Sequence, residues 1–437
     1  MSSFRKNELN IYLVCKKTIL LRIPAKINSF LRKLEKIFSC DRSAGLPAKS
    51  RQIHGFVALL RIMAKSPLSL PAKYPYNLKI VNRKLKIDSM GYFRRNIEEA
   101  EGYEPGFQPK QTDVVKLNTN ENPYPPSPQV LKAVAEINPE QLRRYPDPEG
   151  NAFRKAAAEV NSVGPEYIMC CNGGDELLTI AFRAFCDKKR PVAYPVPTYS
   201  LYPVLANLQN CRAIEVPFDG EFNLPAKLAA TPASLTIICN PNAPTGTFVN
   251  VDELASLADE LSGVLLIDEA YVDFAEENCA ALVKDFDNLI ILRSMSKGYS
   301  LAGLRFGYAI AQPGLIEGLM KVKDSYNVGT LAIAAATAAI KDRKYYTETI
   351  EKVKKERERL IEKLRALGFE VPRSYANFVL ANSKSYKASE IYDKLVQSNI
   401  YVRYFDVPGL DNKLRITVGT SEQNNKLLYT LNKILSE

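Results

Sequence analysis

Short apolar runs alternate with segments of helical spacing between residues 167 and 310. Continuous apolar runs of this length are typical of buried strands in a mainly parallel sheet, and the segments between them would cover its two faces as helices. The sequence therefore predicts an α/β fold, with a large domain built on a mainly parallel mixed sheet flanked by helices. We predict strands over residues 167–171, 192–194, 213–216, 235–239, 264–267, 289–292 and 306–310, and helices over residues 175–185, 199–208 and 252–261.

The two ends of the chain have a different character from this central part. Charged helical patterns follow residue 312, and Gly368 is a typical helix stop. We predict a smaller α+β domain formed by the C-terminal part and an N-terminal arm. Its expected helices are residues 94–101, 129–137, 331–340, 345–367 and 389–397, and its expected strands are 376–381, 400–403 and 414–418. The expected domains are a basic extension (1–89), the arm with part of the small domain (90–140), the large domain (141–320) and the small C-terminal domain (321–437).

The basic charge of the chain is confined to its first 89 residues. They carry 19 Lys and Arg against 4 Asp and Glu, and the remainder carries 40 against 44, so the net charge of +11 belongs to this segment alone. A targeting peptide, a basic anchoring or nucleic-acid arm, and sequence foreign to the folded protein would each fit it. Its apolar runs are too short to span a bilayer. We predict a poorly ordered extension before a natural start at Met90, with no nucleic-acid and no membrane partner.

Histidine and cysteine usage excludes several kinds of site. The single histidine, His54, lies in the basic segment, which excludes Ser-His-Asp triads, HExxH zinc sites and histidine proton relays from the rest of the chain. The eight cysteines show no CxxC spacing and lie mostly in apolar runs. We therefore expect reduced thiols of a cytoplasmic protein, without a disulfide framework or a metal site.

Lys297 lies in a polar stretch between two predicted strands. Residues 294–307 read Ser-Met-Ser-Lys-Gly-Tyr-Ser-Leu-Ala-Gly-Leu-Arg-Phe-Gly. Lysine forms Schiff bases with carbonyl compounds, and small neighbours let such a compound approach closely. Ser294, Ser296 and Arg305 would supply hydroxyl and guanidinium donors to a phosphate. A lysine in a polar turn is otherwise an ordinary surface residue, so the hypothesis depends on what else lies at this edge of the sheet.

Other chemically useful residues follow the predicted strands, where ligands of such sheets bind. Gly174 and Asp175 open a helix after a strand, and free N–H groups there favour a phosphate, although a glycine pair can also be a plain turn. Asp268 would keep a ring nitrogen protonated, or cap a helix or form an ion pair. Tyr271 and Tyr199 would bond to a ring and stack on it, or would simply pack in the core.

Taken in order, these motifs resemble those of the fold-type I, pyridoxal phosphate-dependent aminotransferases, and most closely the histidinol-phosphate aminotransferases. The resemblance extends over 348 residues, 90–437. The motifs that carry it are Leu117-Asn-Thr-Asn-Glu-Asn-Pro-Tyr124, Arg144-Tyr-Pro-Asp147, Gly173-Gly-Asp-Glu176, Pro241-Asn-Ala-Pro-Thr-Gly246, Asp268-Glu-Ala-Tyr271, Ser294-Met-Ser-Lys297, Ala302-Gly-Leu-Arg305, Asn377-Phe-Val379 and Leu414-Arg-Ile-Thr-Val-Gly419. The first and the last of them point to this subgroup.

The resemblance implies pyridoxal 5'-phosphate as the cofactor, bound in the large domain. Lys297 would carry it and later move a proton between the substrate's alpha carbon and the cofactor. Asp268 would pair with the ring nitrogen, Tyr271 would bond to the phenolic oxygen, and Tyr199 would stack on the ring. Tyr145 would reach the cofactor phosphate of a partner subunit, which implies a homodimer. The ligands of the cofactor phosphate would be Ser294, Ser296, Arg305 and the amides of Gly174 and Asp175.

The resemblance also implies small-molecule substrates. We predict transamination between L-histidinol phosphate and 2-oxoglutarate, giving 3-(imidazol-4-yl)-2-oxopropyl phosphate and L-glutamate, as a step of histidine biosynthesis. Arg415 matches the arginine that binds the carboxylate of glutamate. Arg403 and Tyr124 are candidates for binding the substrate phosphate, and Asn122 is a further substrate-binding candidate.

One position departs from the family pattern. Ala243 stands where many relatives carry asparagine before Pro-Thr-Gly, so the usual amide contact to the phenolic oxygen is missing. Asn242, in the rigid turn over residues 240–246, would replace that contact, or Tyr271 would act alone.

Other functions stay open at this point, because specificity within one fold depends on a few pocket side chains. A decarboxylase of a phosphorylated amino acid and an aromatic aminotransferase are the alternatives within the fold. A transcription regulator with a cofactor-sensing domain of this kind is more remote. It would need a winged-helix pattern in residues 1–89, and none is visible.

Overall fold

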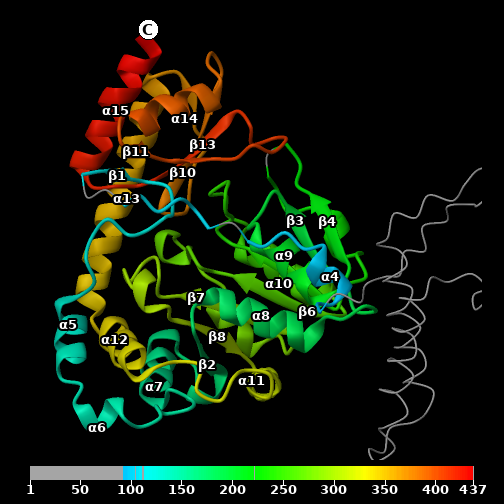
Figure 1. Cartoon of the computed structure of the whole chain (residues 1–437). Coiled ribbons are helices and arrows are strands. Elements are labelled where there is room, and N and C mark those ends of the chain that lie inside the picture. The colour runs from blue at the N-terminus through cyan, green and yellow to red at the C-terminus, as the bar shows by residue number, and fades with distance from the viewer. Residues whose placement is uncertain (1–91, 104, 111–112, 221, 437) are drawn as a thin grey trace, which may run out of the picture. The chain divides into compact units, whose positions relative to one another are not determined.

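The computed structural model describes residues 92–103, 105–110, 113–220 and 222–436. The predicted basic extension lies outside these residues. A seven-stranded sheet, a four-stranded sheet and a short strand pair organise the described chain (Figure 1). No helix in this part combines the length and the hydropathy that a membrane span requires.

The seven-stranded sheet has the order β2–β8–β7–β6–β5–β3–β4. The strands from β4 through β7 pair in parallel, and β8 runs antiparallel to both β7 and β2. The predicted mainly parallel mixed sheet is confirmed, and each strand lies within two residues of its predicted bounds. The strands are β2 (Ile168–Cys171), β3 (Val192–Val196), β4 (Ala213–Pro217), β5 (Leu235–Cys239), β6 (Val264–Asp268), β7 (Leu289–Ser294) and β8 (Gly307–Ala311).

Helices cover both faces of this sheet, so its strands are apolar on both sides. One face packs against the helices α7 (Asn151–Asn161), α10 (Val251–Glu260) and α12 (Thr330–Lys341). The other face packs against α8 (Gly174–Phe185), α9 (Leu201–Gln209) and α11 (Pro313–Met320). This arrangement explains the continuous apolar runs from which the strands were predicted.

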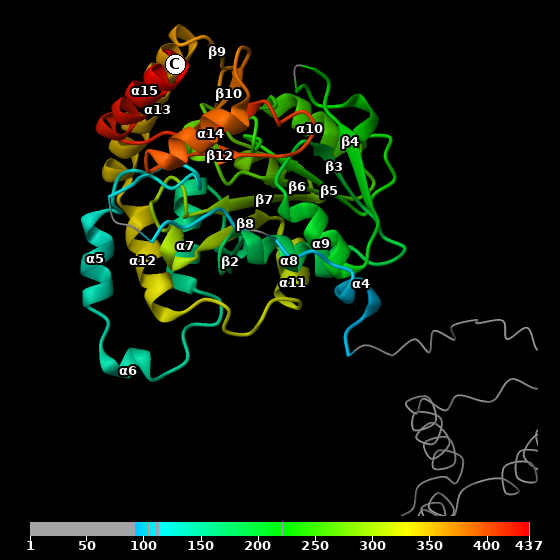
Figure 2. The same ribbon diagram turned by 45° about the horizontal axis from the view of Figure 1, so that its top comes forward.

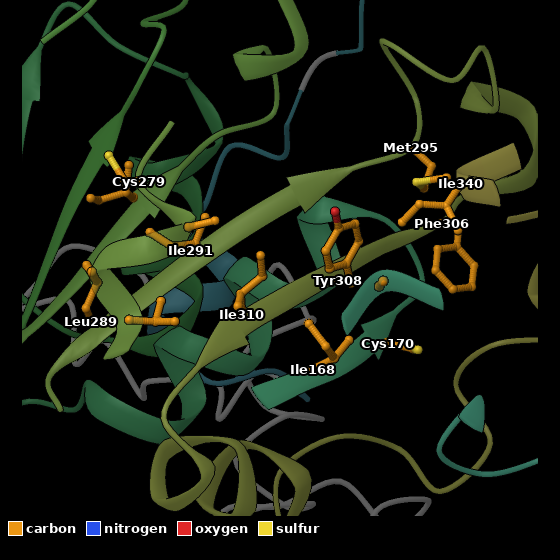
Figure 3. Packing of buried hydrophobic residues seen from close by; sticks show 14 of the residues in the cluster. Ile168, Cys170, Cys279, Leu289, Ile291, Met295, Phe306, Tyr308, Ile310 and Ile340 are labelled. Atoms are coloured by element: carbon orange, nitrogen blue, oxygen red, sulfur yellow. The ribbon is translucent and has the colours of Figure 1, made fainter. Parts of the chain in front are cut away.

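Alternate residues of each strand enter opposite cores, as the side-chain period of two requires. On β7, Leu289 and Ile291 pack on the α7 and α12 side, together with Ile310 of β8 (Figure 3). Their neighbours Ile290 and Leu292 pack on the α8 and α9 side. The same alternation therefore decides on which side of the sheet a polar residue at a strand end emerges.

The four-stranded sheet is antiparallel, with the order β12–β13–β10–β9. Its strands are β9 (Phe369–Glu370), β10 (Phe378–Ser383), β12 (Arg403–Tyr404) and β13 (Lys413–Thr417). The helices α13 (Arg343–Ala366), α14 (Ala388–Gln397) and α15 (Ser421–Ser436) share one apolar core with it. The long helix α13 extends from α12 to α15 in both views (Figures 1 and 2). Gly368, at φ 89°, follows its end, as expected for a helix stop.

The N-terminal arm joins the small sheet region through one strand. β1 (Val115–Lys116) pairs in parallel with β11 (Ile400–Tyr401). The predicted strand over residues 400–403 is therefore two strands, because β11 pairs with β1 whereas β12 pairs with β13. The remaining helices of the arm are α4 (Arg95–Glu98), α5 (Pro128–Ala135) and α6 (Pro139–Leu142).

Candidate active site

Polar side chains gather where β5, β6 and β7 end. Asp268 is the last residue of β6, and Ser294 is the last residue of β7. The sequence had placed both residues just beyond the ends of these strands. In register, Asp268 lies between Cys239 of β5 and Leu292 of β7. The period of two brings Asp268 and Ser294 onto the face that Leu266 and Leu292 share with α8 and α9.

Asp268 is a buried carboxylate, 4 % exposed. Its Oδ2 accepts a hydrogen bond from the Tyr202 hydroxyl at 2.8 Å, and its Oδ1 accepts one from the Ala270 N–H at 3.1 Å. Burial raises the pKa of Asp268 to about 6, and these two hydrogen bonds offset part of that rise. A cation placed next to this carboxylate would restore its charged form.

Lys297 follows β7 and is largely enclosed. Its Nζ donates to the carbonyl oxygen of Thr119 at 3.3 Å and lies 5.5 Å from the ring centroid of Tyr271. Burial and then the positive charge of Arg415 lower the pKa of Lys297 to about 8. Near that pH a large fraction of the amine is neutral, which is the form that attacks a carbonyl carbon.

An anion-binding arrangement lies at the start of α8. We call Gly174, Asp175, Ser294, Ser296 and Arg305 the α8 cluster. Arg305 donates to Ser296 Oγ and to Asp175 Oδ2, both at 3.3 Å, and the Ser296 N–H donates to Ser294 Oγ at 3.2 Å. Because α8 starts at Gly174, the N–H groups of its first turn lack intrahelical partners. Hydroxyls, amides and a guanidinium therefore converge at one helix N-terminus.

A side chain on the residue before α8 would displace Arg305 from its present position. A Cβ on Gly173 would lie 2.6 Å from Arg305 Nη2, and Gly173 also has a φ of 84° that favours glycine. Arg305 itself adopts a left-handed conformation, with a φ of 51°. Tyr199 closes the same region, because its hydroxyl donates to Asp175 Oδ1 at 3.1 Å.

Tyr271 faces the lysine from the loop after β6. Its hydroxyl accepts a hydrogen bond from Asn120 Nδ2 at 3.0 Å, and its ring packs edge-on against Phe378. Burial, only partly offset by Arg415, raises the pKa of Tyr271 to about 12. The hydroxyl is therefore protonated at neutral pH and able to donate.

The Asn242 amide is engaged within its own turn. Its Nδ2 donates to the Pro197 carbonyl at 3.0 Å and to Thr245 Oγ1 at 2.9 Å, and its Oδ1 accepts from Thr198 Oγ1 at 2.8 Å. Ala243 is buried in the core on the α8 and α9 side. In this arrangement the ring of Tyr271 lies near Lys297, whereas the Asn242 amide is held within its own turn.

Two guanidinium groups lie at the small-sheet side of the site. We call Arg403, Arg415, Phe378, Phe405 and Asn118 the arginine cluster. Arg403 and Arg415 are directly opposite each other on β12 and β13, and both lie over the ring of Phe405. Arg415 Nη2 donates to the Asn118 carbonyl at 3.0 Å, but its buried Nε has no partner.

The arginine cluster lacks a compensating acid. Within the described residues, neither Arg403 nor Arg415 has a carboxylate within ion-pair distance. Burial and then the nearby Arg403 lower the pKa of Arg415, while Tyr271 opposes that change. Uncompensated, adjacent guanidinium groups favour an anionic ligand.

Three predicted residues make contacts of other kinds. Asn122 Nδ2 donates to the carbonyl oxygens of Lys297 and Gly298, at 3.1 and 3.3 Å, so it holds the lysine loop against the arm. The Tyr124 ring lies beneath Lys352 Nζ of α13, at 5.5 Å. Tyr145 is 80 % exposed and stacks on Tyr326.

Sequence reasoning missed several residues that shape the site. Tyr202 bonds to Asp268, and Asn120 bonds to Tyr271. Asn120 lies in the motif over residues 117–124, so the sequence pointed to this segment but not to its contact with Tyr271. Tyr202 lies three residues after Tyr199 near the start of α9, and helical spacing gave the only hint that it could reach the sheet.

Comparison with known proteins identifies the family. Residues 112–431 match the family model described as Aminotransferase class I and II. A histidinol-phosphate aminotransferase of Nostoc sp. is 51 % identical over 347 residues, which are 79 % of this chain and 98 % of that protein. The crystal structure of histidinol-phosphate aminotransferase from Sinorhizobium meliloti in complex with pyridoxal-5'-phosphate superimposes with a TM-score of 0.68 at 26 % identity, over 74 % of this chain and 90 % of that one.

L-threonine-O-3-phosphate decarboxylase from Porphyromonas gingivalis has a similar fold, with a TM-score of 0.67 at 25 % identity, over 74 % of this chain and all of that one. The fold is that of the class I and II aminotransferases. Within that class, the chain belongs to the family of histidinol-phosphate aminotransferases.

Proposed function

We propose that this chain transfers an amino group between L-histidinol phosphate and 2-oxoglutarate, giving 3-(imidazol-4-yl)-2-oxopropyl phosphate and L-glutamate. This is a transamination of histidine biosynthesis, and the similarity to the Nostoc protein over nearly its whole length supports it. Pyridoxal 5'-phosphate is the cofactor. When bound, it supplies an electron-withdrawing ring that stabilises negative charge at the substrate's alpha carbon.

The residues present fit this cofactor. Asp268 is a buried acid whose oxygens each accept one hydrogen bond, so both keep a lone pair for a ring N–H. The α8 cluster offers donors for a phosphate, and the absence of a side chain at Gly173 lets the backbone approach closely. Tyr271 would donate to the phenolic oxygen, and Tyr199 would lie against the ring.

Lys297 would perform the proton transfer. Its pKa of about 8 means that a neutral amine is available at physiological pH to accept the proton from the alpha carbon. The Thr119 carbonyl and the Tyr271 ring hold Nζ in place. Because burial keeps water away, the same amine would return the proton without loss to solvent.

The arginine cluster would determine which substrate binds. Two adjacent guanidinium groups without a carboxylate partner suit a doubly charged group better than a single charge, and a phosphate monoester is doubly charged near neutral pH. In the second half-reaction Arg415 would bind the carboxylate of glutamate or 2-oxoglutarate. We assign Tyr124 and Asn122 to the edge of the substrate-binding region around the arginine cluster, where Asn122 holds the lysine loop in position.

We also propose a cytoplasmic homodimer in which Tyr145 contributes to the partner's site. Tyr145 and Tyr326 form an exposed aromatic pair, and Leu131 and Leu142 of α5 and α6 are also exposed, at 67 % and 58 %. Exposed apolar side chains grouped on one region are typical of an interface. The cysteines of the described part are all free, which fits a reducing compartment.

A spectroscopic titration tests this function. The purified protein loaded with pyridoxal 5'-phosphate should show visible absorbance that L-glutamate removes and 2-oxoglutarate restores. L-histidinol phosphate should remove it as well. O-phospho-L-threonine tests the decarboxylase alternative, and carbon dioxide release from it would contradict the proposal, as would a protein that shows no visible band.

A further inference from the structure

Asn120 connects four segments of the chain through hydrogen bonds. It is 1 % exposed. Its Nδ2 donates to the Tyr271 hydroxyl at 3.0 Å, and its backbone N–H donates to Thr417 Oγ1 at 3.0 Å. Its Oδ1 accepts from Thr417 Oγ1 at 3.1 Å, and its carbonyl accepts from Asn377 Nδ2 at 3.0 Å. Asn120 thus links the arm, β13, the segment before β10 and the loop after β6.

Thr417 fixes the orientation of the Asn120 amide. The threonine oxygen accepts the Asn120 N–H, and its own proton is donated to Asn120 Oδ1. The amide oxygen of Asn120 therefore faces Thr417, and its NH₂ group faces Tyr271. The left-handed backbone of Asn120, with a φ of 55°, suits asparagine better than most other residues.

The Asn120 amide in turn determines the direction of the Tyr271 proton. Because NH₂ is a donor only, the Tyr271 oxygen must accept this bond, and its own O–H must point elsewhere. The charged and titratable groups that face Tyr271 are Lys297, Arg415, Asp268, Cys239 and Tyr199. Lys297 and Arg415 are both residues of the site, so Tyr271 borders the space where a ligand would bind, and the proton that Asn120 leaves free could be donated there.

We propose that Asn120 is a positioning residue, which directs the Tyr271 O–H toward the ring oxygen of the cofactor and makes that direction depend on β13 through Thr417. This inference rests on the proposed function, because it assumes that Tyr271 contacts the cofactor. Asn120 itself touches neither cofactor nor substrate in this account. When the cofactor is bound, a hydrogen bond donated to its ring oxygen would stabilise negative charge there and so lower the pH at which the visible absorbance of the loaded enzyme changes.

The pH midpoint of the visible absorbance of the loaded enzyme measures this effect without measuring activity. Tyr271→Phe should raise the midpoint by about 1 to 2 pH units, since one strong hydrogen bond is lost. Asn120→Ala should raise it by roughly half a unit. Asn120→Asp has the same shape but can only accept, so it would draw the Tyr271 proton out of the site and should raise the midpoint about as much as Tyr271→Phe.

Matched variants separate positioning from general stability. Thr417→Val should raise the midpoint by a few tenths of a unit, roughly, and Thr417→Ser should restore it, because serine keeps the hydroxyl. Asn288→Ala removes another asparagine whose Nδ2 donates to backbone carbonyls, those of Ala258, Leu261 and Gly263, and should leave the midpoint unchanged.

A double variant completes the test. Asn120→Ala combined with Tyr271→Phe should have the midpoint of Tyr271→Phe alone, because Asn120 acts through that hydroxyl. Additive shifts, or single Asn120 variants that leave the midpoint unmoved while Tyr271→Phe shifts it, would overturn the role of Asn120. A midpoint that Tyr271→Phe does not move would instead overturn the proposed contact of Tyr271. Should Asn120→Ala fail to fold, Asn120→Asp and Thr417→Val give the same readout.

Discussion

The α8 cluster and the arginine cluster both bind anions in this account, but they are built in opposite ways. The α8 cluster comes from residues 174–305 on one sheet, and its guanidinium is already paired with Asp175 and hydrogen-bonded to Ser296. The arginine cluster joins residues from 118 to 415, and Arg415 Nε has no partner. The guanidinium of the first therefore has a carboxylate and a hydroxyl as partners before any ligand arrives, whereas the guanidinium groups of the second have no carboxylate partner in the described part of the chain. We infer that the α8 cluster defines the chemistry and that the arginine cluster selects the substrate.

Lys297→Ala should have the largest effect, because it removes the amine that would carry the cofactor. Turnover should fall by about 10⁴-fold or more, since the nucleophilic amine and the proton-transfer group are lost together. Steady-state turnover and the visible spectrum are the measurements. Lys297→Arg is the matched control that keeps the positive charge, and it should be equally inactive. A variant that retains a tenth of the activity would contradict the assignment.

Exchanging one arginine in each cluster for methionine tests the division of roles. Arg415→Met should lower kcat/KM for glutamate by about 10² to 10³-fold and leave cofactor affinity nearly unchanged, because a buried charge pair with the substrate is lost. Arg305→Met should instead weaken cofactor binding by roughly 10 to 100-fold. Cofactor titration of the unloaded protein and substrate kinetics at saturating cofactor separate the two effects. If both variants had equal effects on cofactor binding and on substrate kinetics, the proposed division of roles between the two clusters would be wrong.

Asp268→Asn should stabilise the cofactor-free protein at pH 8. Burial raises the pKa of Asp268 from 3.8 to about 6, so the folded chain binds this proton more tightly than the unfolded chain does. Protonation of Asp268 stabilises the folded chain below about pH 4, and this contribution to the free energy of unfolding is lost as the pH rises through 6. Removing the charge should raise the free energy of unfolding by about 2 kcal/mol at pH 8, with no gain below pH 4.

Asp147→Asn is the matched control for that measurement. Burial is the largest single influence on the pKa of Asp147 and raises it, but the hydrogen bonds that the carboxylate accepts, among them those from the N–H groups of Asn151 and Glu149, together lower it. The expected sign is therefore opposite, a loss of stability at pH 8, which solvent screening keeps small because Asp147 is exposed. The free energy of unfolding in urea should be measured for both variants at pH 4 and at pH 8. A destabilised Asp268→Asn protein at pH 8 would show that its hydrogen bonds outweigh its buried charge.

Removal of residues 1–89 should have the smallest effect. Every residue assigned to either cluster lies beyond this segment, and the matched 347 residues already span 98 % of the Nostoc relative. We expect kcat/KM within about twofold of the full chain. A large loss of activity would show that the segment contributes to the site or to folding.

The two clusters also differ in how well the sequence predicted them. The strands leading to Asp268 and Ser294 are continuous apolar runs, because helices bury both faces of the sheet, and so the end of each strand was visible. Asp175 follows β2 and Arg305 precedes β8, and the two residues meet because these neighbouring strands are antiparallel. The local sequence pattern was therefore sufficient to predict the position of a site residue that lies at the end of a strand of the large sheet.

Long-range contacts could not be predicted in this way. Asn120 meets Thr417, and Arg415 meets Asn118, across 297 residues of sequence, and no periodicity describes such pairs. The helix α7 was missed because its N-cap residue is Gly150, which offers no side-chain cap, so the usual start signal is missing. The role of Asn242 shows the same limit, since its amide is engaged by Pro197 and Thr245.

The phosphate requirement of the amino donor tests the central claim most directly. The rate at which the visible band disappears should be measured with L-histidinol phosphate and with L-histidinol, which differ only in the phosphate. If Arg403 and Arg415 select a dianion, kcat/KM for this half-reaction should be at least about 10²-fold higher with the phosphate. The preference should fall below about tenfold in Arg403→Met, while glutamate remains a donor. Equal rates for the two donors in the unaltered protein would contradict the account.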